Sequence, residues 1–150
     1  MRIIVGADHG GVELKQLIVK YLRDKGHQVE DVGTHSAEPV DYPTYAIQVA
    51  GAVRNYRVER GILVCGSGIG MCITANRVPG VRAALVYEPY GAKMSRKHND
   101  SNILCLGGRF IGRDLAIEIV DTWLKTPFDG GRHKRRIDLI DELVHKYVQS

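Results

Sequence analysis

The sequence predicts a three-layer α/β/α sandwich, in which helices cover both faces of a five-stranded parallel sheet. Two observations lead to this fold class. Short runs rich in β-branched residues alternate with amphipathic helical patterns along the chain, and this order is typical of a parallel sheet. The length of 150 residues fits a single domain, 1-150, which can bury roughly 70% of the surface that the unfolded chain exposes.

Five short apolar runs are predicted to form the strands of this Rossmann-like sheet. They are 2–7 (RIIVGA), 27–32 (HQVEDV), 61–65 (GILVC), 82–87 (RAALVY) and 102–107 (NILCLG). Helical patterns lie between and after them, and Gly26 is the expected stop of the first helix. The apolar faces of three helices are Leu14, Leu17, Ile18, Tyr21 and Leu22; Ala116, Ile119, Val120, Trp123 and Leu124; and, in a final helix at about 133-148, Ile137, Ile140, Val144 and Tyr147.

The composition is that of an ordinary globular protein, with 44% apolar and 25% charged residues. The N-terminus enters a strand-like run at once, without the features of a signal peptide. No apolar run approaches the ~20 residues that span a bilayer. We therefore expect a cytoplasmic protein that does not bind membranes.

Cysteine spacing and charge argue against a disulfide-linked protein, a zinc site and a nucleic-acid-binding protein. The cysteines Cys65, Cys72 and Cys105 are odd in number and lack C-x-x-C spacing, which favours reduced thiols over disulfides or a zinc site. The net charge of +4 arises largely from GRHKRR at 131–136. Such a local cluster indicates an anion site, whereas nucleic-acid binders spread positive charge over a face. We expect no metal, no cofactor and no nucleic-acid partner.

Polar clusters follow three of the predicted strands, at 8–11, 66–70 and 107–112. Open parallel sheets bind ligands beyond the carboxyl ends of their strands, so these clusters mark the expected site. The segment 95–102 instead lies just before the fifth strand and therefore starts on the opposite side of the sheet. A single chain does not obviously bring it to the same crevice.

Cys65 is the first candidate for chemistry, because it ends a strand and precedes a glycine-rich turn and a short helix. Backbone N–H groups in such a turn favour a thiolate, although a buried cysteine is also a common small apolar residue. The glycines at 66, 68 and 70 do not fit the dinucleotide pattern G-x-G-x-x-G. They permit close approach to an oxyanion, and Ser67 supplies a movable proton.

Other candidates are a carboxylate, two imidazoles and three arginines. Asp8 and His9 follow the first strand and either bind a sugar phosphate or form a helix cap and a solvated imidazole. His98 is either a group for proton transfer near neutral pH, to which its side chain is suited, or an exposed histidine without a role in chemistry. The arginines Arg132 and Arg136 are four apart at the start of the last helix, where an anionic ligand would compensate their charge, and Arg109 could join them.

Five motifs, in order along nearly the whole chain, resemble the type B ribose-5-phosphate isomerase family of sugar-phosphate isomerases. They are DHGG, DYP, CGSGIGMCITANR, SRKHNDSNILCLGGR and TPFDGGRHKRRI. The resemblance implies a homodimer, or a dimer of dimers, without metal or cofactor. It also implies interconversion of ribose 5-phosphate and ribulose 5-phosphate through a cis-enediolate, in the pentose phosphate pathway of carbohydrate metabolism. The last helix would pack at the dimer interface.

The resemblance also implies roles for individual residues. Cys65 would be the base that moves a proton between C1 and C2, His98 the acid that opens the sugar ring, and Ser67, often threonine in the family, a proton relay. Met71 stands where other members carry a glutamate base, and Cys72 where serine is frequent. Substrate-binding positions would be Asp8, His9, Tyr42, Gly66, Ser67, Gly68, Ile69, Gly70, Asn99, Arg109, Arg132 and Arg136, with His98 and the arginine-bearing segments supplied by the partner subunit.

Two other functions stay open at this point. An isomerase of a hexose 6-phosphate, such as allose or galactose 6-phosphate, would need only a longer cavity. A non-catalytic module that binds sugar phosphates or nucleotides would not need both Cys65 and His98.

Overall fold

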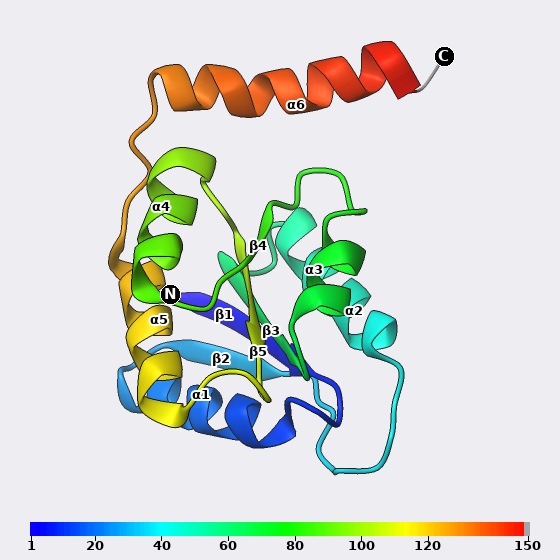
Figure 1. The fold of residues 1–150 in the computed structure, drawn as a ribbon, viewed down its shortest axis with the longest axis vertical. Helices are drawn as coiled ribbons and strands as arrows, with labels where there is room; N and C mark the ends of the chain where they lie inside the picture. The colour runs from blue at the N-terminus through cyan, green and yellow to red at the C-terminus, as the bar shows by residue number, and fades with distance from the viewer. Residues whose placement is uncertain (149–150) are drawn as a thin grey trace.

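A parallel sheet of five strands runs through the middle of the protein, whose computed structural model describes residues 1–148 (Figure 1). The strands are β1 (Arg2–Ala7), β2 (Gln28–Asp31), β3 (Arg60–Cys65), β4 (Ala83–Leu85) and β5 (Ile103–Gly107). They lie in the order β2-β1-β3-β5-β4, and all four pairings are parallel. The predicted sheet is confirmed, with ends that differ from the expected ones by up to two residues.

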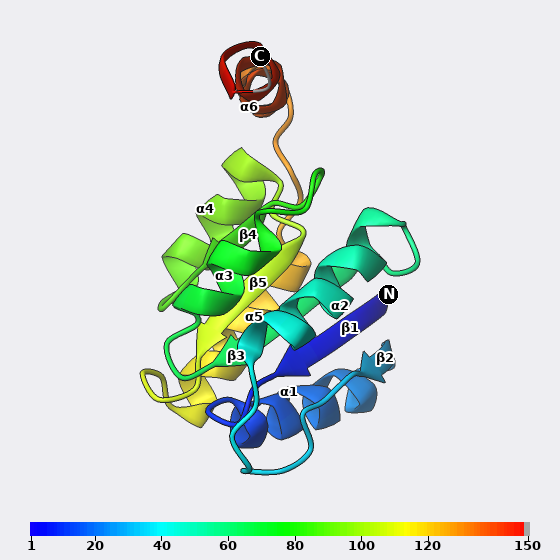
Figure 2. The same ribbon diagram turned by 90° about the vertical axis from the view of Figure 1, so that its right-hand side faces the viewer.

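Helices cover both faces of this sheet, so the three-layer prediction is also confirmed. The described residues form α1 (Val12–Asp24), α2 (Tyr42–Arg54), α3 (Ile69–Ala75), α4 (Pro89–Asn99), α5 (Arg113–Lys125) and α6 (Arg132–Val148). Helices α1, α4 and α5 pack on one face, and α2 and α3 on the other (Figure 2). Each connection between strands thus contributes a helix to one of the two outer layers.

The central strands are apolar along their whole length because both of their faces are covered. In β3, Ile62 and Val64 join the core beneath α1, α4 and α5, whereas Leu63 and Cys65 join the core beneath α2 and α3. This alternation follows from the two-residue period of a strand. It leaves Cys65, the last residue of β3, on the α2–α3 side.

Helix α1 ends as the sequence predicts. Leu14, Ile18 and Leu22 are buried against the sheet, and the helix stops at Asp24. Gly26 then adopts a φ of 87°, a left-handed conformation that glycine reaches without steric cost. The chain turns there and enters β2.

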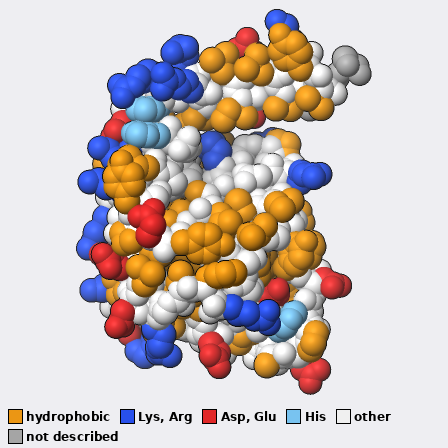
Figure 3. All heavy atoms as spheres, viewed as in Figure 1, with side chains coloured by type: hydrophobic (Ala, Val, Ile, Leu, Met, Phe, Trp, Pro, Cys, Tyr) orange, Lys and Arg blue, Asp and Glu red, His pale blue; other side chains and the backbone are white. Residues whose placement is uncertain are grey.

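Helix α6 stands apart from the sandwich, at the end of an extended segment of residues 126–131 (Figure 1). Apolar side chains line it, and Figure 3 shows them gathered along the helix. Ile140, Leu143, Val144, Tyr147 and Val148 are between 44% and 72% exposed. Within residues 1–148, no helix has the length and apolarity needed to cross a membrane.

A buried ion pair holds α1 to the end of β2 and generates a prediction about stability. The Lys15 ammonium is fully buried, and both carboxylate oxygens of Asp31 lie 2.7 Å from it. The Asp31→Asn substitution leaves this cation without its counter-charge. We expect the free energy of unfolding, measured by urea denaturation, to fall by about 3–5 kcal/mol.

The matched control is Asp24→Asn, because both side chains of the Lys20–Asp24 pair within α1 are exposed. Exposed pairs contribute little, so the control should change the free energy of unfolding by less than about 1 kcal/mol. Equal losses in the two variants would show that burial of Lys15 does not decide the effect.

Candidate active site

The loop after β1 places two polar side chains at the carboxyl edge of the sheet. Asp8 is buried, and its Oδ1 accepts a hydrogen bond of 2.9 Å from the backbone N–H of Gly10. The Nδ1 atom of His9 accepts a hydrogen bond of 3.1 Å from the backbone N–H of Val40. A neutral imidazole that accepts at Nδ1 carries its proton on Nε2. The hydrogen bond from Val40 therefore leaves the Nε2–H group of His9 as a hydrogen-bond donor. The sequence pattern did not indicate this contact.

Cys65 lies at the same edge, with its thiol turned toward the following loop. Its side chain is 5% exposed, and its Sγ accepts a hydrogen bond of 3.1 Å from the backbone N–H of Gly68. Gly68 has a φ of 81°, and a Cβ there would lie 2.6 Å from the side chain of Leu85. Only glycine allows this turn, which folds a backbone donor back onto the sulfur.

The rest of the glycine loop packs under aromatic side chains. The Oγ of Ser67 accepts a hydrogen bond of 3.2 Å from Ile69 N–H, and its carbonyl accepts one of 2.7 Å from the Tyr87 hydroxyl. The ring of Tyr42, at the start of α2, lies so close that a Cβ at Gly70 would be 2.7 Å from it. The donor to the thiol, Gly68 N–H, thus belongs to the loop that leads into α3.

Arg109, which follows β5, completes the group at this edge. Its backbone N–H donates to the carbonyl of Gly66 at 3.0 Å, and a Cβ at Gly66 would lie 3.1 Å from its guanidinium. The carboxyl edge thus brings together a first group of predicted site residues. They are Asp8, His9, Tyr42, Cys65, Gly66, Ser67, Gly68, Ile69, Gly70 and Arg109.

His98 and Asn99 lie at the opposite edge. They are the last residues of α4 and precede β5, whose first residue, Ile103, pairs with Gly61 near the start of β3. Cys65 pairs with the last residue of β5, four positions further along. At about 3.3 Å per residue the two edges are separated by about 13 Å of strand. One chain does not bring His98 to Cys65.

The remaining predicted residues join His98 at this second edge. Arg132 and Arg136 are exposed in the first turns of α6. His133 lies between them in the chain, is 8% exposed, and stacks on His98 with ring centroids 4.3 Å apart and planes 9° apart. Desolvation lowers the pKa of His133, and the neighbouring His98, Arg132 and Arg136 lower it further. The stack joins the start of α6 to the end of α4.

The second edge also contains three groups of the types that bind metals. His98, Asp129 and His133 offer ligand atoms that lie within 4.8 Å of one another. Imidazole lone pairs lie in the ring plane, however, and two parallel stacked planes cannot meet at one ion. Lys97 also occupies a carboxylate oxygen of Asp129 at 3.6 Å. We therefore assign no metal to this cluster.

Two further thiols share the core with Cys65. Cys105, on β5, is fully buried, and Cys72, on α3, is only partly buried. A hydrogen bond from the Cys105 thiol lowers the pKa of Cys72 to about 7, and the same bond, with burial, raises the pKa of Cys105. We therefore expect Cys72, which is partly exposed, to react beside Cys65 in alkylation experiments.

A groove separates α6 from the body of the domain. Its volume is about 830 Å³, and its walls come from residues 76–84 on one side and from α6 on the other. Ile137, Ile140 and Val144 supply an apolar wall from α6. Asn99, from the second group of site residues, lines the same groove.

Comparisons with known proteins agree with this arrangement. The model of the family described as Ribose/Galactose Isomerase matches residues 3–140. Ribose-5-phosphate isomerase B of Escherichia coli is 49% identical, over 97% of each chain. The structure of Clostridium thermocellum ribose-5-phosphate isomerase B is 52% identical, with a TM-score of 0.96 over 98% of this chain and 99% of that one.

A further solved structure carries a ligand. It is ribose-5-phosphate isomerase B from Mycoplasma genitalium with bound ribulose-5-phosphate, 43% identical, with a TM-score of 0.91 over 95% of each chain. The family model and these relatives each cover nearly the whole chain. The chain therefore belongs to the ribose/galactose isomerase family.

Proposed function

We propose that the protein is an aldose-ketose isomerase that interconverts D-ribose 5-phosphate and D-ribulose 5-phosphate through a cis-enediolate. The observation that carries the proposal is the Cys65 thiol beside the N–H groups of the glycine loop, with Gly68 N–H 3.1 Å from the sulfur. Relatives that cover almost the full chain bear the name of this enzyme, and one of them was solved with the ketose product bound.

The thiol and the loop have complementary tasks in this reaction. A proton on the carbon beside a carbonyl is too weakly acidic for a free thiolate, unless the charge that develops on oxygen is stabilised. The Cys65 thiolate takes the C2 proton of the aldose, and the electron pair moves onto the carbonyl oxygen to form the enediolate. The N–H groups of Gly66 to Gly70 that do not donate to the sulfur bind this oxygen. The proton then returns to C1, and Ser67 relays a proton between the two oxygens.

His98 and the arginines serve the rest of the substrate. Ribose 5-phosphate is mostly a closed furanose, and an imidazole at the ring oxygen donates the proton that opens it. Asp8 and Asn99 bind the hydroxyls. Binding of the distant phosphate by Arg132 and Arg136, assisted by His9 and Arg109, aligns C1 and C2 with the sulfur, which converts remote binding energy into orientation.

These tasks require two chains, so we infer a homodimer with composite sites. In one chain the base and the ring-opening acid lie at opposite edges of the sheet. The apolar side chains of α6 and the groove beneath it are open in the single chain. A second copy would cover them and would bring its own His98, Asn99, Arg132 and Arg136 to the neighbour's Cys65.

The proposed reaction needs neither a metal nor an organic cofactor, since all proton transfers use side chains of the protein. We place it in the cytoplasm and in the pentose phosphate pathway. An assay of ribose 5-phosphate alongside allose 6-phosphate tests the substrate directly. Faster turnover of allose 6-phosphate would favour the hexose reading, and binding without turnover would favour a non-catalytic module.

The role of Cys65 predicts the effect of Cys65→Ala. Removal of a general base commonly lowers turnover by about 10²- to 10⁴-fold, and inorganic phosphate should still bind because the anchor is elsewhere. Initial rates and inhibition by phosphate measure both effects. Cys72→Ala is the matched control and should keep most of the activity. A Cys65→Ala enzyme with most of its turnover would remove Cys65 from the chemistry.

Ring opening and enolisation can be separated with His98→Asn. Ribulose 5-phosphate has no free C5 hydroxyl and cannot form a furanose, so exchange of its C1 proton in D₂O needs only the base. We expect His98→Asn to retain this exchange, followed by NMR, while the conversion of ribose 5-phosphate falls by about 10²-fold or more. Cys65→Ala should lose both. Equal loss of exchange and conversion in His98→Asn would exclude a specific ring-opening role.

Composite sites predict complementation between two damaged homodimers, Cys65→Ala and Arg136→Ala. Under subunit exchange, half of the dimers become mixed, and each mixed dimer has one intact and one doubly damaged site. Activity should rise toward about a quarter of the unsubstituted enzyme. Subunit exchange confirmed by mass spectrometry without recovery of activity would place the whole site within one chain.

A further inference from the structure

The turn that follows His98 and Asn99 has a left-handed backbone conformation at a residue other than glycine. Asp100 ends α4 with a φ of 45°, in the left-handed region. Glycine is the common residue at this position of a helix end, because a Cβ is disfavoured there. Aspartate and asparagine are the other residues that adopt this conformation, because their short polar side chains can hydrogen-bond locally.

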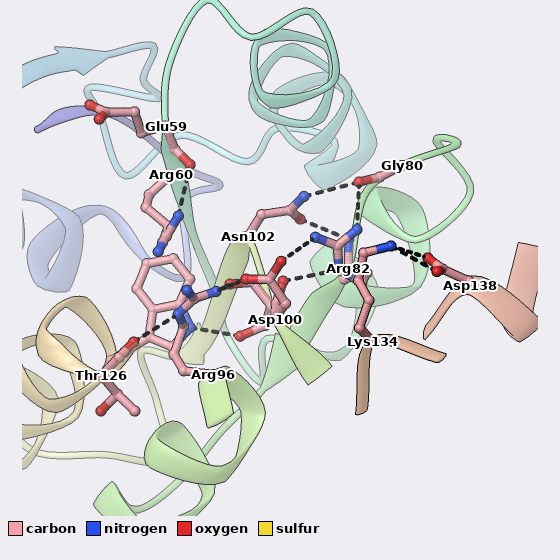
Figure 4. Close-up of polar contacts among 12 residues, drawn as sticks. Glu59, Arg60, Gly80, Arg82, Arg96, Asp100, Asn102, Thr126, Lys134 and Asp138 are labelled. Carbon is pink, nitrogen blue, oxygen red and sulfur yellow. Dashed lines mark hydrogen bonds and ion pairs between the residues drawn. The ribbon is translucent and has the colours of Figure 1, made fainter. Parts of the chain in front are cut away.

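Two arginines hold the Asp100 carboxylate between them (Figure 4). Oδ1 lies 2.8 Å from Nη1 of Arg96, and Oδ2 lies 3.1 Å from Nη2 of Arg82. The Nε of Arg82 also donates to the Asp100 carbonyl at 2.9 Å. The Arg96 side chain is 4% exposed, so its charge depends on this carboxylate for compensation.

Arg96 extends this contact toward the second element of the site. Its Nε donates to the carbonyl of Thr126 at 3.2 Å, and its Nη1 donates to that of Ser101 at 2.6 Å. Thr126 begins the segment that leads to α6. Further along that segment, Asp129 N–H donates to the carbonyl of Lys97 at 3.0 Å. The same arginine therefore ties the end of α4 to the approach of α6.

We propose that Asp100, held between Arg82 and Arg96, is a positioning residue for His98, Asn99 and the start of α6. It acts through the backbone and through Arg96, by fixing the direction in which α4 ends and the place from which α6 departs. The inference rests on the proposed function, since the groups it positions are the proposed ring-opening acid and phosphate-binding arginines.

Two substitutions separate the carboxylate from the backbone. Asp100→Gly removes the arginine contacts but suits the left-handed conformation. Asp100→Asn removes the negative charge and keeps a side chain that also tolerates the left-handed conformation. We expect both variants to remain folded, to lower kcat/KM for ribose 5-phosphate roughly 10- to 100-fold, and to weaken inhibition by inorganic phosphate. If Asp100 served only to end the helix, Asp100→Gly would be as active as the unsubstituted enzyme, and that result would overturn the proposal.

The matched control is Asp138→Asn on α6. This carboxylate pairs with Lys134 at 2.7 Å, is 59% exposed, and lies outside the Asp100 contacts (Figure 4). It should leave kcat/KM and phosphate inhibition unchanged. A loss equal to that of Asp100→Asn would attribute the effect to charge in general and overturn the proposal.

A second measurement does not depend on turnover. The stacked rings of His98 and His133 shield each other, so their imidazole protons should resonate upfield in NMR spectra, with His98→Asn and His133→Gln used for assignment. Both Asp100 variants should lose this shielding, and unchanged shifts would overturn the proposal. Absence of turnover in the unsubstituted enzyme would instead overturn the proposed function, and the shifts would then decide the role of Asp100 alone.

Discussion

The parallel pairing of β3 with β5 is the constraint on which the site depends. Parallel strands end at one edge of a sheet, so the residues that follow strands gather there, and those that precede strands gather at the other edge. Cys65 is the last residue of β3 and Arg109 follows β5, whereas His98 and Asn99 precede β5. The sheet therefore places the groups of the proposed reaction at two different edges, and the proposed homodimer would bring them together.

Helix α6 has apolar side chains that the single chain leaves largely exposed. An isolated helix of this length is marginal in water, and most helices gain their stability from an apolar face that packs against the rest of the protein. In the single chain, α6 is held by the stack of His133 on His98 and leaves several large apolar side chains exposed. Arg132 and Arg136, which are proposed to bind phosphate, thus stand on a helix whose large apolar side chains are mostly exposed.

The two edges are built by different means. At the carboxyl edge, backbone N–H groups and close contacts around glycines place donors beside Cys65, with few ionised side chains involved. At the amino edge, ion pairs between side chains fix the structure, and the Asp100 carboxylate lies between Arg82 and Arg96. Backbone donors suit the oxyanion of the proposed reaction, and the exposed charges of Arg132 and Arg136 suit the phosphate of the proposed substrate.

Most of the fold could be predicted from the pattern of residues that lie close together in the chain. The strands, the stop of α1 at Gly26 and the position of Cys65 at the end of a buried strand depend on residues close together in the chain. The glycine loop is a continuous segment, so its donors could be foreseen next to the thiol. The order of elements also indicated that His98 starts on the other side of the sheet.

Tertiary structure alone decided the contacts between distant segments. The stack of His98 on His133, the hydrogen bond from Val40 to His9, and the pair of Arg82 with Asp100 join residues that are 18 or more positions apart. The effect of Cys105 on the pKa of Cys72 likewise arises from packing of α3 against β5. Periodicity reports which face of an element is apolar, whereas these pairings follow from where each element is placed by the others.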